Sequence, residues 1–131
     1  MILKTIEDRE EFDALLNQYD RICFFIDSTW SGPSKAALPR FQKLADDYPD
    51  NVFVVIENGA TESFIYAWLI EQQKTFEERN VNLKPRTNLW IHGNGEVIMV
   101  VKGYWEWITV LYNAPEGVKV LKQFLEKDTG G

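Results

Sequence analysis

Hydrophobic and polar positions follow two kinds of pattern along the chain, and these separate the expected strands from the expected helices. Continuous apolar runs at 22–26 and 52–56, each bounded by polar residues, predict strands that are buried on both faces of a sheet. Apolar residues that recur at helical spacing predict amphipathic helices. Their ranges are 8–19, 34–48, 62–79 and 115–125.

The remaining segments complete the order of elements. Residues 1–6 predict a short edge strand, and strands at 89–91 and 97–101 flank the sequence His92-Gly93-Asn94-Gly95, which is typical of a hairpin turn. The aromatic-rich segment 104–112 is left without a firm assignment, although alternating residues within it are compatible with an extra edge strand. Strand–helix–strand crossovers make their strands parallel, so we expect an α/β fold with a central mixed sheet of four to five strands and helices on both faces.

Length, charge and composition narrow the functional classes. A chain of 131 residues predicts a single domain over 1–127, followed by a flexible polar tail at 128–131. The net charge of −6 disfavours nucleic acid and anionic membranes as partners. No apolar run approaches the roughly 20 residues of a membrane span, and the N-terminus does not resemble a secretory signal. One cysteine, Cys23, and one histidine, His92, make an internal disulfide impossible and a closed zinc site implausible. We expect a cytoplasmic protein without a metal or cofactor.

One motif carries most of the functional information. The sequence Trp30-Ser31-Gly32-Pro33-Ser34-Lys35 lies between a buried strand and a helix. It resembles the thioredoxin family, whose redox motif at this point is Trp-Cys-Gly-Pro-Cys-Lys.

The resemblance extends beyond the motif. Pro39 stands where thioredoxins have a helix-kinking proline, 94–97 resembles their hairpin turn, and Gly103 fits the glycine that ends the next strand. The resemblance implies the thioredoxin fold. Members of the family are protein-disulfide oxidoreductases, so the resemblance also implies a protein thiol or disulfide as the substrate. Two insertions distinguish the chain from a minimal thioredoxin: the helix at 62–79 is longer than the family's, and residues 104–113 are additional.

Ser31 and Ser34 occupy the positions of the family's two redox cysteines. A helix N-terminus stabilises a thiolate there, but a hydroxyl is far less acidic than a thiol and cannot form a disulfide. We therefore expect no dithiol–disulfide activity from this sequence. The serines are either natural losses or engineered substitutions. A hydrolytic role would need a positioned base, and His92 is expected at the far end of its strand.

Other features of the family are altered as well. Thioredoxins bury an acid five residues before the motif tryptophan, where this chain has Phe25, and we expect Asp27 to face outwards. The family's groove-closing cis-proline, followed by threonine, corresponds here to Pro85, Arg86 and Thr87, with Arg86 at the proline position. The resemblance implies a partner groove between these residues and the motif.

An aromatic cluster offers a second candidate surface. Its members are Tyr104, Trp105, Trp107 and Tyr112. Aromatic side chains are enriched in binding hot spots, but they serve equally to cover a sheet edge or to cap a core. The other residues of the motif match the family but also have ordinary structural explanations. These are a packed aromatic for Trp30, a turn for Gly32, a helix start for Pro33 and a solvated side chain for Lys35. Cys23 is expected to be an inert core thiol.

Two functions from different classes follow. The favoured hypothesis is a redox-inactive thioredoxin-like protein that binds a protein partner without covalent exchange. The alternative is a Cys-to-Ser active-site variant of a thioredoxin-type disulfide oxidoreductase. A structural subunit of a larger assembly is a third, weaker possibility.

Overall fold

The computed structural model describes residues 2–59, 64–78, 91–112 and 115–126. The elements in chain order are β1 (Ile2–Ile6), α1 (Arg9–Gln18), β2 (Arg21–Ser28), α2 (Gly32–Asp47), β3 (Val52–Asn58), α3 (Phe64–Glu78), β4 (Glu96–Val101), β5 (Tyr104–Val110) and α4 (Glu116–Glu126).

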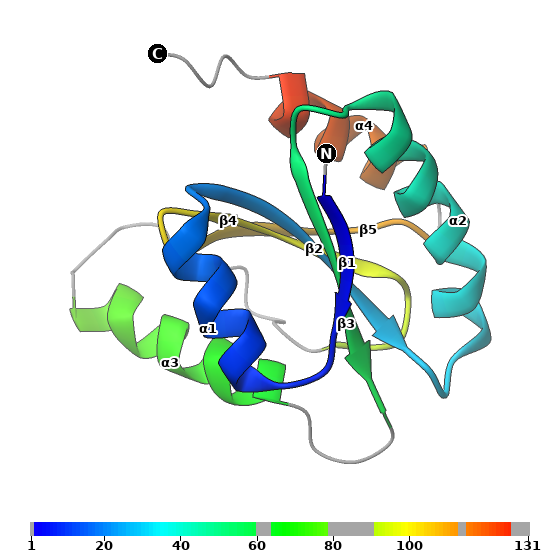
Figure 1. Cartoon of the computed structure of the whole chain (residues 1–131). Helices are drawn as coiled ribbons and strands as arrows, with labels where there is room; N and C mark the ends of the chain where they lie inside the picture. The colour runs from blue at the N-terminus through cyan, green and yellow to red at the C-terminus, as the bar shows by residue number, and fades with distance from the viewer. Residues whose placement is uncertain (1, 60–63, 79–90, 113–114, 127–131) are drawn as a thin grey trace.

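The strands form one mixed five-stranded sheet with the order β1-β3-β2-β4-β5. Strands β1, β3 and β2 run parallel, and β4 and β5 complete the sheet in antiparallel pairings. Helices α1 and α3 cover one face, and α2 and α4 cover the other (Figure 1). The expected mixed sheet with helices on both faces is therefore confirmed.

Strand β2 lies at the centre of the sheet and divides the core into two layers. Its side chains point alternately to the two faces, as in any strand. Ile22, Phe24 and Ile26 join the apolar cluster beneath α1 and α3. Cys23 and Phe25 join the cluster beneath α2 and α4. Both clusters contain fully buried aromatic rings, so both faces of the strand are excluded from water, as the continuous apolar run predicts.

The hairpin forms at a different place from the one that the sequence predicts. The expected turn at 92–95 is a loop, and Ile91 before it is not in a strand. The hairpin instead joins β4 to β5 through Lys102 and Gly103, whose φ angles are 52° and 81°. Two consecutive residues with positive φ match the right-handed twist of the flanking strands, which explains why this turn closes the hairpin. Segment 104–110 is thus the extra edge strand.

The outer edge of β5 is protected. A register shift opposite Met99 and Val100 interrupts its pairing with β4, and the backbone N–H of Trp105 donates to the side-chain oxygen of Gln72 on α3 at 2.9 Å. Bulges and covering side chains are common ways of preventing an edge strand from pairing with another chain.

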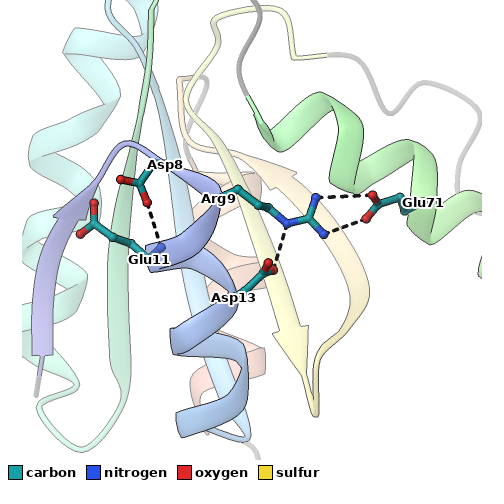
Figure 2. Close-up of polar contacts among 5 residues, drawn as sticks. All are labelled: Asp8, Arg9, Glu11, Asp13 and Glu71. Carbon is teal, nitrogen blue, oxygen red and sulfur yellow. Dashed lines mark hydrogen bonds and ion pairs between the residues drawn. The ribbon is translucent and has the colours of Figure 1, made fainter.

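Polar contacts fix the start of α1 and join it to α3 (Figure 2). Asp8 is the N-cap, and its carboxylate accepts the backbone N–H of Glu11 at 2.9 Å, so the expected helix start is confirmed. Arg9 pairs with Asp13 at 2.9 Å and with Glu71 of α3 at 2.8 Å. The Arg9–Asp13 pair lies within α1 and the Arg9–Glu71 pair links it to α3, and because these side chains are exposed both pairs contribute little to the stability of the fold.

We predict that Gly117→Ala destabilises the protein. A Cβ atom at this position of α4 would lie 1.6 Å from the carbonyl oxygen of Val110. Alanine gains about 1 kcal/mol of helix propensity over glycine. Overpacking against backbone costs about 1–3 kcal/mol, so we expect a net loss. Gly32→Ala is the matched control because nothing lies within 4 Å of its Cβ position. Urea unfolding of the two variants checks the prediction, and equal stability would contradict it.

Candidate functional site

The motif lies at the junction between β2 and α2. Strand β2 ends at Ser28, Ser31 is the N-cap of α2, and Pro33 lies in the first turn of the helix, where a missing N–H does no harm. The backbone N–H of Ser31 donates to the carbonyl of Ser28 at 2.9 Å, and that of Lys35 donates to the carbonyl of Ser31 at 3.2 Å. The two serines therefore stand at the positive end of the helix dipole.

Ser34 is completely buried, and its hydroxyl is used inside the protein. The Oγ atom accepts the backbone N–H of Ser28 at 2.9 Å and lies 3.4 Å from the carbonyl oxygen of Ile26. The hydroxyl thus connects the first turn of α2 to the end of β2.

Ser31 is 7% exposed, and its hydroxyl also points inwards. Its Oγ donates to the carbonyl oxygen of Gly93 at 2.5 Å. Gly93 has φ +75°, and a Cβ atom there would lie 2.7 Å from the Trp30 ring and 2.8 Å from Ser31. Only glycine combines this backbone conformation with so close an approach to the motif.

Glu96 holds the loop that contacts Ser31. Its buried carboxylate accepts the backbone N–H groups of His92 at 3.2 Å and Asn94 at 3.1 Å. Gly95, the last residue of the loop, packs so closely on α2 that a Cβ atom would lie 2.3 Å from the Cβ atom of Ala37. The loop is therefore fixed from both sides.

Residues 111–112 connect this loop to a second point on α2 through hydrogen bonds. The backbone N–H of Tyr112 donates to the carbonyl of Asn94 at 3.1 Å. Arg40 of α2 donates to the carbonyls of Leu111 at 2.7 Å and Tyr112 at 2.5 Å. Helix α2 is thus hydrogen-bonded to the loop 92–95 at Ser31 and to residues 111–112 at Arg40. We call these two hydrogen-bonded segments the frame of the motif.

Two aromatic side chains stay exposed on this frame. Trp30 is 53% exposed and Tyr112 is 39% exposed. We call Trp30, Gly93, Asn94 and Tyr112 the motif face.

Asp27 lies beside the motif, and the expectation that it faces outwards is wrong. It has the same orientation in β2 as Cys23 and Phe25, which point beneath α2. The carboxylate is half-buried. Burial raises its pKa, while the Ser34 hydroxyl and the charge of Lys35 oppose that rise. This chain therefore has an acid under the motif, two residues after the position where the family buries its own.

His92 is also closer to the motif than expected, because the loop 92–95 packs against α2 instead of turning at the far end of a hairpin. Its side chain is exposed. The Ser31 proton is directed at a carbonyl oxygen, which cannot act as a general base, so the geometry does not support a hydrolytic serine.

The aromatic cluster expected from the sequence is divided by the structure. Tyr104 is the first residue of β5 and Tyr112 lies two residues beyond its last one, so the length of the seven-residue strand, roughly 20 Å, lies between them. Trp105 is 4% exposed and belongs to the core beneath α1 and α3. The side chain of Trp107 lies outside the part of the chain that the structure describes. The four residues therefore do not form one surface.

Other predicted residues have simpler outcomes. Pro85, Arg86 and Thr87 lie outside the described residues, so the expected groove stays a prediction. Cys23 is buried as expected, and burial raises the pKa of its thiol to about 12, which keeps it protonated. Gly32 and Lys35 are exposed at the start of α2.

The described residues hold no group of three or more histidine, cysteine or acidic side chains that could bind a metal ion. Among the helices of the described ranges, none is long and apolar enough to cross a membrane.

The sequence interpretation missed Arg40 and Glu96, and it placed Asp27 on the wrong face of its strand. Asp27 had a usable signal, since the period of two in β2 places it on the face of Cys23 and Phe25. The other two act on the backbone of distant segments, and only the tertiary structure brings them to these partners.

We predict that Asp27→Asn changes how stability depends on pH. Because the folded pKa is raised, the contribution of Asp27 is full below the unfolded pKa of 3.8 and is lost as pH rises through the folded pKa. In urea unfolding, the variant should therefore gain stability relative to the parent as pH rises from below 3.8 through the folded pKa, and the gain should level off above it. Asp46→Asn, on the exposed last turn of α2, controls for the loss of one charge. A stability difference that stays constant or falls with pH would contradict this assignment.

Comparison with known proteins supports the resemblance found in the motif. No family model matches the chain. Thioredoxin-1 of Schizosaccharomyces pombe is 29% identical over 102 residues, which cover 78% of this chain and 86% of that protein.

Solved structures agree on the fold. A poplar thioredoxin h aligns with a TM-score of 0.62 at 19% identity, over 96% of this chain and 98% of the other. A Plasmodium falciparum thioredoxin aligns with a TM-score of 0.57 at 19% identity, over 95% and 97%. Together with the sheet order and the position of the motif, these similarities identify the chain as a thioredoxin-like protein with the thioredoxin fold.

Proposed function

We propose that this protein binds a protein partner without covalent exchange, through the motif face. The observation that carries the proposal is the direction of the side chains around the motif. Both serine hydroxyls point inwards to backbone partners, while Trp30 and Tyr112 remain exposed.

The chemistry of the motif supports a non-catalytic role. Dithiol exchange needs a thiolate to attack and a second thiol to release the substrate. Ser31 and Ser34 supply neither. The buried Cys23 does not replace them, because its pKa of about 12 keeps the thiol protonated inside the core. A helix dipole stabilises a nearby negative charge by about 1 kcal/mol, which is far too little to ionise a serine.

The rigidity of the site supports binding. Aromatic side chains that are already held in place lose little freedom when a partner packs against them. Trp30 lies against Gly93, and the backbone of Tyr112 is bonded to both Asn94 and Arg40. The surface is therefore organised before a partner arrives.

One observation favours the second candidate, a Cys-to-Ser variant of a disulfide oxidoreductase. Asp27 lies beside the side chain of residue 34, where a carboxylate could exchange a proton with a thiol. A purely structural motif would not need an acid at this place.

We expect the protein to show no reduction of protein disulfides when it is coupled to an electron donor. Activity that survives Cys23→Ala would contradict the proposal. The double variant Ser31→Cys with Ser34→Cys separates the two candidates. Turnover by this variant supports an oxidoreductase ancestry, and inactivity of the folded variant, verified by circular dichroism, supports a long-standing loss of the chemistry.

We also expect Trp30→Ala and Tyr112→Ala each to weaken binding of a partner purified from the protein's own cell extract by about tenfold, since exposed aromatics dominate many interfaces. Tyr104→Ala is the matched control, because Tyr104 is also 39% exposed but stands at the other end of β5. Dissociation constants from calorimetry check this prediction. Equal losses in all three variants, or no loss in the first two, would show that the motif face is not the binding surface.

A further inference from the structure

Charge is distributed very unevenly along this acidic chain. Residues 28–45 contain Lys35, Arg40 and Lys43 and no acidic residue. The other 113 residues contain 11 basic and 20 acidic side chains. The segment that carries the motif is thus positive in a protein whose net charge is −6.

The positive residues gather on the exposed side of α2. Lys35, Pro39 and Lys43 are all exposed and are spaced four residues apart, so they follow one another along the helix for about 12 Å. Arg40 is exposed beside them while it also holds the carbonyls of Leu111 and Tyr112. We call Lys35, Pro39, Arg40 and Lys43 the basic strip.

The basic strip begins next to the motif face. Trp30 precedes the first turn of α2, whose N-terminus adds a partial positive charge of the same sign. Acids stand at both ends of the basic strip: Asp27 and Glu57 lie in register at the ends of β2 and β3, and Asp46 and Asp47 follow Lys43 by three and four residues on α2. Asp27 is half-buried beneath Lys35 and neutralises part of its charge, whereas Lys43 lies two turns further along the helix.

We propose that the partner of the motif face presents an acidic segment, whose carboxylates lie along the basic strip while an apolar side chain packs on Trp30. This rests on the proposed function and specifies the chemistry of its partner. The other 113 residues carry 11 basic and 20 acidic side chains, a net charge of −9, so the charge pattern favours binding of such a segment along the basic strip.

A short acidic peptide fits this pattern better than a nucleic acid does. Three cations can match a few carboxylates over the length of the basic strip. A long polyanion would continue past it onto Asp46 and Asp47 and then onto an acidic protein surface.

The test uses three fluorescein-labelled peptides of about 12 residues, which share a central leucine and differ only in carrying four Glu, four Gln or four Lys residues. Fluorescence anisotropy with the full chain should show about tenfold tighter binding of the Glu peptide than of the Gln peptide at about 50 mM salt. The difference should shrink at about 300 mM salt, where the Debye length is shorter.

Matched variants locate the contact. Lys35→Gln with Lys43→Gln should weaken Glu-peptide binding by about fivefold or more and leave Gln-peptide binding unchanged. The control, Lys119→Gln with Lys122→Gln on α4, removes the same charge and should stay within about twofold.

Equal binding of the Glu and Gln peptides overturns the acidic-partner proposal, as does equal weakening by the two double variants. Tighter binding of a single-stranded oligonucleotide than of the Glu peptide overturns it in favour of nucleic acid. The proposed function is tested separately, because Trp30→Ala still weakens partner binding if the motif face binds a neutral segment.

Discussion

The central strand β2 is buried on both faces, and this constraint organises the rest of the molecule. Alternate side chains of one strand must fill two separate cores, so helices are required on each side of the sheet. The strand then ends directly under the first turn of α2. Unlike its apolar centre, the last residues of the strand make polar contacts. Asp27 lies beneath the helix, and the backbone N–H of Ser28 donates to the buried Ser34 hydroxyl.

Hydrogen bonds explain how a motif with serine at both positions is held in place. A cysteine pair is held by its own disulfide in the oxidised state, and this chain has no such bond. A hydrogen bond from Ser31 to Gly93 instead attaches α2 to the loop 92–95, and a second one from Arg40 to Tyr112 attaches it to the residues that follow β5. The hydroxyl groups of Ser31 and Ser34 thus make structural hydrogen bonds at the positions where the family's cysteines carry out thiol chemistry.

Most of the fold could be predicted from local patterns, and the exceptions depend on distant contacts. The apolar runs of β2 and β3 are unambiguous because burial on both faces leaves no polar positions. The Gly-Asn-Gly sequence at 93–95 wrongly predicted a hairpin turn, because glycine also occurs where segments pack closely. Here the two glycines allow the loop to approach Ser31 and Ala37. The position of the motif was predictable from the strand before it and the helix after it, whereas the grouping of Trp30 with Tyr112 was not, since 82 residues separate them.

The uneven charge distribution suggests why the site is assembled on α2 rather than elsewhere. A helix N-terminus is weakly positive in any protein, and here the same helix adds three cations before its first acid, Asp46. Evenly mixed charges would have been sufficient to keep the helix soluble. In a thiol enzyme the positive end of the helix stabilises a thiolate. With serines in place, the Asp27 carboxylate beneath Lys35 compensates part of this potential, and Lys43 lies two turns further along the helix. The acidic segment that we propose would meet the part of this potential that faces solvent, at the same helix end where thiol enzymes stabilise a thiolate.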